Sequence, residues 1–378
     1  MKRLLCLLLI LCCVCSVPQG QAENLSSRRF SSLDCFGSVA TLVLYDDFST
    51  PESLDRAVSA WQDILGRFDE IERSISLDMA DSDAVRFAAA KPGETIQVSE
   101  HFFLLTEMAL DLHAETEGMY NPGVGLLVDL WGFSPRFLED NTKTALPYDR
   151  PWLEGHPLLM PGEEYIAAFT QLAATFLNVV CTETDTGFFV TKPDEAYVIV
   201  GDETYTLMLD FGGIGKGYAC DQAISILETY GYEYGYISAG SSSMRFLSKP
   251  TQDGNWSVGI RNPFTTDAAD HVCALLLQNT SMSTSGTYVN RYTLNGNTYH
   301  HIIDPETGYP SKGKLVSATI IGESAARCDA LTTALIAMDA ERAQRFASEN
   351  GLLCLLVFQS GDSYSIFTTM DDTMFQPR

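Results

Sequence analysis

The segment DFGGIGKGYACD at residues 210–221 carries four glycines and one lysine between two stretches of different character. The apolar run before it, residues 205–209, is typical of a β-strand, and residues 223–227 after it are typical of a helix. Glycine at such a junction permits positive φ and close approach of a ligand, and a helix N-terminus attracts phosphate. A tight turn with an exposed lysine explains the segment equally well. The spacing matches neither a Walker loop nor the Gly-x-Gly-x-x-Gly fingerprint of a dinucleotide fold.

On either side of this junction, helical patterns come mainly early and strand patterns mainly late. Residues 53–75 place apolar side chains on one helical stripe, and Ser99 is a candidate N-cap for a helix over residues 99–116. Further helices are expected at 163–176 and 324–338, a short one from Asp83, and strands at 39–44, 256–260, 316–321, 352–358 and 363–368. Residues 272–304 suggest a β-meander with a turn at Asn295-Gly296. This order predicts an α+β fold, with mixed or antiparallel sheets and flanking helices.

The first 22 residues have the pattern of an export signal. Lys2 and Arg3 precede an apolar run over residues 4–17, and Gly20-Gln21-Ala22 offers a small-x-small cleavage site. A membrane anchor is the alternative, and four cysteines in this region leave a lipid-anchored form open. We therefore expect a signal over residues 1–22, one two-lobed domain over residues 23–378, and an extracytoplasmic location.

Acidic residues dominate the chain of 378 residues, whose formal net charge is −25. Such a surface repels nucleic acid and anionic lipid. An anionic ligand would therefore need a local positive focus, from a metal ion, a lysine or a helix N-terminus. The six cysteines beyond the signal are scattered and form no Cys-x-x-Cys pair, so buried thiols are favoured, although the sequence does not decide whether any of them form disulfides.

Asp329 and Thr333 lie four residues apart in an otherwise apolar helical pattern and so share one helix face. A buried aspartate is costly unless it is paired. A hard cation such as Mg²⁺, with carboxylate, hydroxyl and carbonyl ligands, would satisfy it. Local capping or pairing of Asp329 is the alternative.

His300 and His301 are neighbours in a strand pattern, so their side chains point to opposite faces. One of them could act as a proton-transfer base near neutral pH. Asp304 opens a turn over residues 304–308, and a purely structural hairpin is the alternative. A hydrolase triad of Ser285, His301 and Asp304 lacks the nucleophile-elbow motif that would support it.

Five motifs in register resemble the FAD:protein FMN transferase family, also called the ApbE family. They are YNPGVGLLVDLWGF at 120–133, the segment at 210–221, TSG at 284–286, HIIDPETG at 301–308 and DALTTA at 329–334. The similarity covers roughly residues 33–340. It implies an exported Mg²⁺-dependent enzyme with its flavin site between two lobes, which cleaves FAD and transfers FMN to a Ser or Thr hydroxyl of a partner flavoprotein, releasing AMP.

The resemblance also implies roles for individual residues. Asp329, Thr333 and a carbonyl near Gly213 would hold Mg²⁺, and His301 would be the catalytic base. Contacts to FAD would come from Phe36, Asp78, Tyr120, Asn121, Asp210, Lys216 and His300. Five features depart from the family pattern. Phe36 replaces a usual Met, Asp78 a frequent aromatic residue, Gly215 a common Ala, and Ser241-Ser242-Ser243 a usual Gly-Asp, while Thr287-Tyr288-Val289-Asn290 follows the family's Tyr-containing segment only loosely.

Three other functions stay open at this point. The site could hydrolyse FAD to FMN and AMP with water as acceptor, or bind flavin without turnover, or the motifs could survive only as turns of an adhesion or scaffold protein. The resemblance implies an acceptor with a Ser/Thr-Gly-Ala-Ser/Thr segment. This chain contains no such segment, so flavinylation of the chain itself at such a site is not expected.

Overall fold

The computed structural model describes residues 25–134, 160–267, 269–361 and 363–377. The signal predicted at residues 1–22 therefore lies outside the described residues. None of the helices within the described ranges combines the length and the apolar character needed to cross a bilayer.

The centre of the molecule is an eight-stranded sheet of order β1-β2-β8-β9-β12-β15-β16-β17, in which every neighbouring pair is antiparallel. Its strands are β1 (Ser26–Cys35), β2 (Ser38–Asp46), β8 (Gly235–Ala239), β9 (Ser243–Phe246), β12 (Ser281–Gly286), β15 (Leu315–Gly322), β16 (Leu353–Ser360) and β17 (Ser363–Thr368). The α+β class with antiparallel strands is thus confirmed. Strand β1 was not predicted. It pairs with β2 through a tight turn at Phe36-Gly37, where φ is 52° and 64°.

Both faces of this sheet are buried. Successive side chains of a strand point to opposite faces, so Cys354 and Leu356 enter the main core while Leu355 and Val357 enter a second, smaller core. Helices cover the first face: α1 (Pro51–Ile75), α7 (Gly215–Thr229), α8 (Ala325–Ala337) and α9 (Ala340–Glu349). A three-stranded sheet of β10 (Trp256–Arg261), β11 (His271–Leu277) and β18 (Phe375–Pro377) builds the second core.

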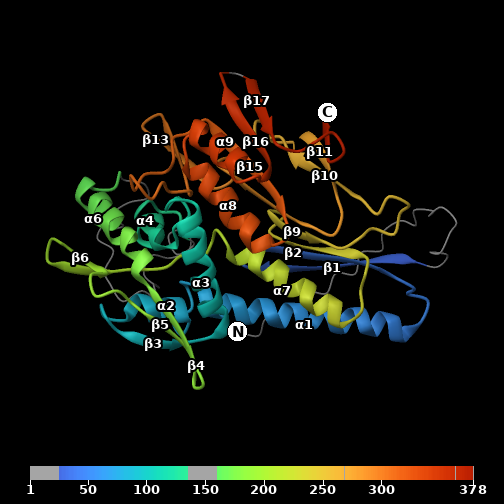
Figure 1. Cartoon of the computed structure of the whole chain (residues 1–378), viewed down its shortest axis with the longest axis horizontal. Coiled ribbons are helices and arrows are strands. Elements are labelled where there is room, and N and C mark those ends of the chain that lie inside the picture. Colours follow the sequence, from blue (N-terminus) through green and yellow to red (C-terminus); the bar gives the residue numbers. More distant parts are fainter. Residues whose placement is uncertain (1–24, 135–159, 268, 362, 378) are drawn as a thin grey trace.

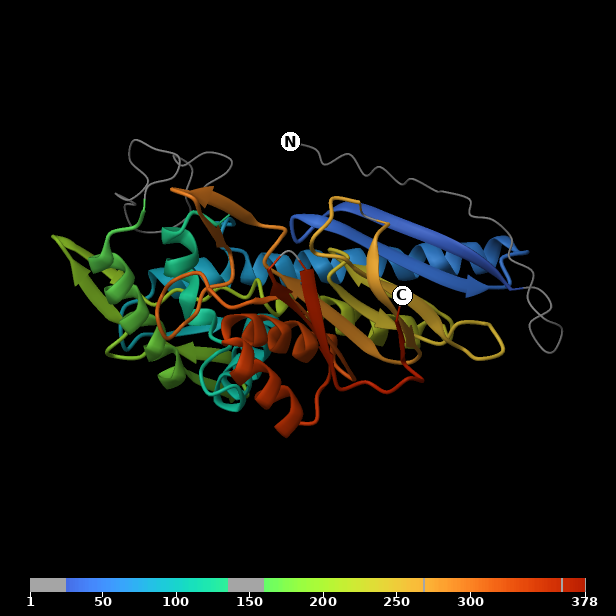
Figure 2. The same ribbon diagram turned by 90° about the horizontal axis from the view of Figure 1, so that it is seen from above.

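Most of the remaining elements form what we call the helical lobe, residues 83–206 as far as they are described, which lies to one side of the large sheet (Figure 1). It contains α2 (Asp83–Ala89), β3 (Thr95–Val98), α3 (Glu100–Glu115), η1 (Pro122–Val124), α4 (Gly125–Leu130), α6 (Glu163–Ala173), η3 (Ala174–Asn178), β4 (Val180–Thr184), β5 (Gly187–Thr191), β6 (Tyr197–Val200) and β7 (Glu203–Thr206). Helix α1 runs from this lobe to the far end of the β1–β2 hairpin in both views (Figures 1 and 2).

Local predictions were confirmed where they rested on capping or periodicity. Ser99 caps α3 by accepting a hydrogen bond from the N–H of Phe102, and α1 and α8 occupy their expected ranges. The turn at Asn295-Gly296 joins β13 (Arg291–Leu294) to β14 (Asn297–His300), with φ of 51° and 79°. The six described cysteines are free thiols, and five of them are buried.

Three local predictions were wrong. The meander over residues 272–304 is broken, because β11 pairs with β10 and β18 while β12 pairs with β9 and β15. The strand before the glycine segment ends at Thr206, so residues 207–209 are not part of it. Helix α7 begins at Gly215, inside the glycine segment rather than beyond it, and α9 was not foreseen.

Candidate active site

The glycines of the central segment permit close packing of α7 against its neighbours. A Cβ atom at Gly217 would lie 2.2 Å from the carbonyl oxygen of Ala325 on α8, and one at Gly213 would lie 3.0 Å from the Thr333 hydroxyl. Only glycine allows the backbone of α7 to approach α8 this closely. The segment therefore brings the start of α7 against the helix that carries Asp329 and Thr333.

Helices α7 and α8 cap one another through two aspartates. Asp221 on α7 accepts hydrogen bonds from the N–H groups of Ala325 and Ala326, at 2.8 and 3.0 Å, and from the Ser324 hydroxyl. Asp329 on α8 accepts a hydrogen bond of 3.1 Å from the N–H of Gly217 in the first turn of α7. A carboxylate at a helix N-terminus is stabilised by the free N–H groups and the helix dipole.

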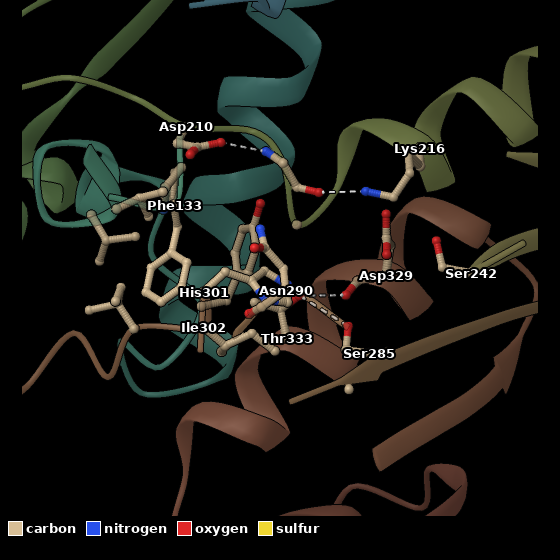
Figure 3. Close-up of a pocket in the computed structure, with 18 of the residues that line it drawn as sticks. Phe133, Asp210, Lys216, Ser242, Ser285, Asn290, His301, Ile302, Asp329 and Thr333 are labelled. Carbon is tan, nitrogen blue, oxygen red and sulfur yellow. Dashed lines mark hydrogen bonds between the residues drawn. The ribbon is translucent and has the colours of Figure 1, made fainter. Parts of the chain in front are cut away.

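Asp329 lies beside a cavity of about 540 Å³ between the sheet and the helical lobe (Figure 3). Its side chain is buried, and its Oδ1 accepts a hydrogen bond of 2.9 Å from the Ser283 hydroxyl on β12. Thus each carboxylate oxygen has one donor from the protein, and a carboxylate has about four lone-pair sites. The remaining acceptor capacity is available to a ligand of the cavity.

The oxygen atoms around Asp329 fit a hard cation. Gly213 and Thr333 line the same cavity, and the Thr333 hydroxyl also lies 3.4 Å from that of Ser285. Within the described ranges, no group of three or more His, Cys, Asp or Glu side chains could hold a metal. One carboxylate with a hydroxyl and a carbonyl suits Mg²⁺, which keeps several waters and takes its other ligands from substrate phosphates.

Asp210 and Lys216 hold the glycine segment in shape at the cavity wall (Figure 3). Asp210 Oδ1 accepts a hydrogen bond of 2.8 Å from the N–H of Gly212, and Lys216 Nζ donates one of 2.9 Å to the carbonyl of Gly212. The N–H of Asp210 also bonds the carbonyl of Pro122, at 2.8 Å, which ties this segment to the helical lobe. Lys216 supplies positive charge inside a strongly acidic chain.

The two adjacent histidines differ in the use of their ring nitrogens. His301 lines the cavity, and its Nδ1 lies 3.2 Å from the carbonyl oxygen of Asn290. A carbonyl can only accept, so Nδ1 carries the proton and Nε2 keeps a lone pair. Burial, and secondarily the charge of Lys216, lower the pKa of His301 below its usual value of 6.5, which favours the neutral, basic form.

His300 is buried and does not line the cavity. Its Nε2 donates to the carbonyl of Ser311 at 2.8 Å, and its Nδ1 accepts from the N–H of Ile302 at 3.3 Å. Burial, with the neighbouring His301, lowers its pKa to about 4. Both nitrogens are engaged within the protein, so the geometry gives His300 a structural position rather than the predicted contact with FAD.

The helical lobe contributes a wall containing Tyr120 and Asn121. Among the described residues, the buried Tyr120 hydroxyl has no hydrogen-bond partner. Burial, followed by the charges of Asp329 and Asp210, raises the pKa of Tyr120 well above its usual value, so the phenol stays a neutral donor. An unpaired buried donor beside a cavity is the feature that a polar ligand would satisfy.

Asn121 is engaged within the protein on both sides of its amide. Its Oδ1 accepts from the N–H of Gly123 at 2.8 Å, and its Nδ2 donates to the carbonyl of Ala173 at 3.1 Å. Phe36 lines the opposite part of the cavity from the β1–β2 turn and packs edge-on against Phe68. Asp78 is exposed and does not line the cavity, so the structure does not bring it to the others.

The structure adds cavity residues that sequence reasoning left without a role. They are Met119, Val124, Val128, Phe133, Ser242, Thr284, Val289, Asn290, Ile302 and Ile303. Ser283 lies outside the lining but supports Asp329 from β12. The TSG motif at residues 284–286 belongs to the same strand, yet which hydroxyl of that strand meets Asp329 depends on the pairing of β12 with β9 and β15.

Comparison with known proteins identifies the family. The model of the ApbE family matches residues 36–356. The chain belongs to the ApbE family. Members of similar sequence include FAD:protein FMN transferase of Klebsiella pneumoniae (strain 342), 29% identical over 95% of this chain and 91% of that protein. The protein of the same name from Escherichia coli (strain K12) is 28% identical over 82% and 79% of the two chains.

Solved ApbE structures have the same fold. The ApbE protein of Thermotoga maritima superposes with a TM-score of 0.70 at 25% identity, covering 92% of this chain and 98% of its own. The flavin transferase ApbE of Vibrio cholerae superposes with a TM-score of 0.67 at 23% identity, covering 91% and 97%. The predicted fold and family are thus confirmed.

Proposed function

We propose that this protein transfers FMN from FAD to a Ser or Thr hydroxyl of a partner protein and releases AMP. One observation carries the proposal: in a chain of the ApbE family, His301 lines the same cavity as Asp329, Thr333 and Gly213. The curated relatives in that family are named for this reaction. A base and a set of cation ligands are the two parts that cleavage of a diphosphate by a hydroxyl requires.

The reaction forms one phosphorus–oxygen bond and breaks another. The acceptor hydroxyl oxygen attacks the phosphorus of the FMN half, and the bond from that phosphorus to the bridging oxygen breaks, so AMP leaves with the bridging oxygen. The proton of the hydroxyl goes to Nε2 of His301, whose Nδ1–H is held by Asn290. Attack in line with the leaving group needs little from the protein beyond positioning and this base.

The charges of the diphosphate need compensation in so acidic a chain. Asp329, Thr333 and the carbonyl at Gly213 would hold Mg²⁺, which neutralises phosphate oxygens and stabilises the leaving phosphate when bound. Lys216 and the N-terminus of α7 add positive charge from the same side. The unpaired Tyr120 hydroxyl is a further donor for a substrate oxygen.

The partner and the location belong to the same proposal. The acceptor would present an exposed Ser/Thr-Gly-Ala-Ser/Thr segment, and the apolar run at residues 4–17 supports export of the protein, with or without a lipid anchor. Export would bring the enzyme to flavoproteins outside the cytoplasm.

The test mixes the protein lacking residues 1–22 with FAD, Mg²⁺ and a flavoprotein fragment that carries the acceptor segment. We expect the fragment to gain the mass of an FMN group and AMP to appear in equal amount. Asp329→Ala and His301→Ala should abolish both products. AMP and free FMN without a modified fragment would replace the transferase with a hydrolase, and FAD binding without AMP would leave only a binding protein.

A further inference from the structure

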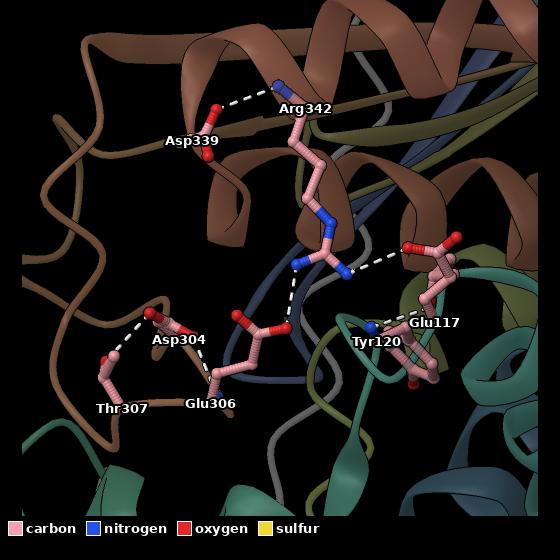
Figure 4. Close-up of polar contacts among 8 residues, drawn as sticks. Glu117, Tyr120, Asp304, Glu306, Thr307, Asp339 and Arg342 are labelled. Atoms are coloured by element: carbon pink, nitrogen blue, oxygen red, sulfur yellow. Dashed lines mark hydrogen bonds and ion pairs between the residues drawn. The ribbon is translucent and has the colours of Figure 1, made fainter.

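Arg342 on α9 joins two segments that are far apart in the sequence. Its Nη1 donates to Glu306 Oε1 at 2.8 Å, and its Nη2 donates to Glu117 Oε2 at 3.2 Å (Figure 4). The backbone N–H of Arg342 is capped by Asp339, at 2.9 Å, so the side chain starts from a fixed point at the beginning of α9. One guanidinium thus bridges two carboxylates from different parts of the chain.

The two carboxylates belong to segments that lead to different walls of the active-site cavity. Glu117 precedes Tyr120 by three residues, and Tyr120 belongs to the wall that the helical lobe provides. Glu306 follows Pro305, which lines the cavity, in the turn that begins just after His301. Arg342 therefore links the wall proposed to contact FAD with the segment that carries the proposed base.

Each segment is held in its conformation by internal hydrogen bonds. The N–H of Tyr120 donates to the Thr116 hydroxyl at 2.9 Å, and the Tyr120 carbonyl accepts from His113 at 3.0 Å. In the other segment, Asp304 accepts hydrogen bonds of 2.8 Å from the Glu306 N–H and from the Thr307 hydroxyl (Figure 4). A change in their separation would therefore move each segment largely as a unit.

Between the two segments lies open space rather than packed side chains. A second cavity of about 580 Å³ is lined by Gly118 and Asn121 on one side and by Pro305 and Glu306 on the other. Asn121 and Pro305 also line the active-site cavity, so the two spaces adjoin. Close packing holds the far end of the segment that carries Glu306, where Gly308 meets Thr170 of α6, but the cavity interrupts it between Glu117 and Glu306.

We propose that Arg342 is a positioning residue that sets the separation between the Tyr120–Asn121 wall and the His301–Glu306 segment. The proposal rests on the proposed function, because this separation determines how closely the His301 base meets an acceptor hydroxyl beside bound FAD. A misplacement of about 1 Å in such a geometry is enough to slow a reaction markedly.

Arginine suits this task better than lysine. Its planar guanidinium presents several donors in fixed directions, whereas the lysine ammonium is a point charge on a flexible stem. The Arg342 side chain is 20% exposed, whereas those of Glu117 and Glu306 are 75% and 59% exposed. Such pairs are weak in isolation and screened by salt, so the effect on the reaction should be moderate and depend on ionic strength.

The kinetic test compares Arg342→Gln with Arg345→Gln. Arg345 is an exposed arginine on the same helix, so its substitution changes the charge equally and serves as the matched control. We expect kcat of transfer to fall about three- to tenfold in Arg342→Gln, with FAD affinity changed less than about twofold. The pH at the midpoint of the kcat profile should stay unchanged, and Arg342→Lys should recover part of the loss. The difference from wild type should shrink in about 1 M salt.

A double-mutant cycle identifies the route of the effect. If Arg342 acts through Glu306, then Glu306→Gln alone should lower kcat, and adding it to Arg342→Gln should lower kcat little further. Additive losses, an unchanged kcat in Arg342→Gln, or an equal loss in Arg345→Gln would each overturn the proposal. Glu306→Gln and Arg342→Lys also provide the test if Arg342→Gln does not fold.

A structural readout separates this proposal from the proposed function. Hydrogen exchange in the full chain without FAD should become faster in Arg342→Gln over residues 116–121 and 302–308 together, and not in Arg345→Gln. If wild type transfers no flavin but the exchange changes as expected, the proposed function fails and the link stands. If wild type transfers flavin and exchange in both segments is unchanged, the positioning role is refuted.

Discussion

The two ends of the α7–α8 pair use the same chemistry for different purposes. Asp221 and Asp329 are both carboxylates that cap the N-terminus of the neighbouring helix. Asp221 meets two N–H groups and a hydroxyl at the start of α8, away from the cavity lining. Asp329 meets one N–H and one hydroxyl, and it faces the cavity with acceptor capacity to spare. Asp329 is buried and Asp221 only partly so, and Asp329 alone directs its remaining acceptor capacity into the cavity, which is why we propose it and not Asp221 as a cation ligand.

The same Asp→Asn substitution at the two ends should abolish activity in one case and lower stability in the other. Asn can keep the hydrogen bond from the N–H of Gly217 on its one carbonyl oxygen, and the Ser283 hydroxyl can turn to accept from its NH2 group, but Asn loses the charge that a cation needs. We expect Asp329→Asn to lower transfer by at least about 10³-fold, corresponding to the loss of several kcal/mol of stabilisation at the phosphate. Initial rates of transfer at saturating FAD, with the Mg²⁺ concentration varied, measure this loss.

Asp221→Asn is the matched variant. It should lower the free energy of unfolding by about 1–2 kcal/mol, because a charged cap is lost, while turnover per folded molecule stays within about threefold of wild type. Denaturant titration measures the free energy of unfolding, and the transfer rate divided by the concentration of folded protein measures the turnover. Equal loss of activity in both variants would refute the distinction between the two carboxylates.

The adjacent histidines extend the comparison to bases. No described residue forms a hydrogen bond with Nε2 of His301, whereas both nitrogens of His300 are engaged. We expect His301→Gln to lower kcat about 10²-fold or more, which is the usual contribution of a general base. His300→Gln should instead lower thermal stability and leave turnover of the folded fraction close to wild type. A larger kinetic effect at His300 would show that the free nitrogen is not the deciding feature.

How far the sequence predicted this site depended on the range of the interactions. Asp329 and Thr333 were predictable because a helix of known period puts them on one face, and the α8 pattern is strongly apolar. The hydrogen-bond partners of Asp329 were not predictable from the sequence. Gly217 lies 112 residues away, and Ser283 lies 46 residues away on a strand whose neighbours are set by the whole sheet.

Two further differences between the predicted and the observed structure also arise from interactions distant in the sequence. A contact of Asp78 with FAD was expected from the resemblance to the family pattern, but the loop after α1 leaves Asp78 exposed and outside the cavity. Helix α9 was missed, because charged residues separate its few apolar ones. The position of Arg342 between two carboxylates could not be predicted either, because Glu306 and Glu117 lie 36 and 225 residues away. Local patterns predict elements, whereas the tertiary arrangement decides which polar groups are left unpaired.

A smaller effect tests the support that Asp329 receives from the sheet. Ser283→Ala removes the hydroxyl that donates to Oδ1. We expect the Mg²⁺ concentration for half-maximal rate to rise about tenfold, with the rate at saturating Mg²⁺ nearly unchanged, because groups that orient a metal ligand mainly affect affinity. Ser281→Ala is the control, since Ser281 is buried on the same face of β12 but donates to the carbonyl of Glu323. Equal shifts in the two variants would contradict a specific role for Ser283.

The smallest expected effect concerns the charge of Lys216 on the base. Neutral His301 is the active form, so kcat should rise with pH through a midpoint below 6.5, because burial and then Lys216 lower the pKa of His301. Lys216→Gln removes one of these causes, so the midpoint should move to higher pH, whatever happens to the maximal rate. The shift should shrink as salt is added, since the interaction between the two groups is electrostatic. A midpoint that stays in place would mean that burial alone sets the basicity of His301, and a midpoint that moves to lower pH would exclude His301 as the titrating base.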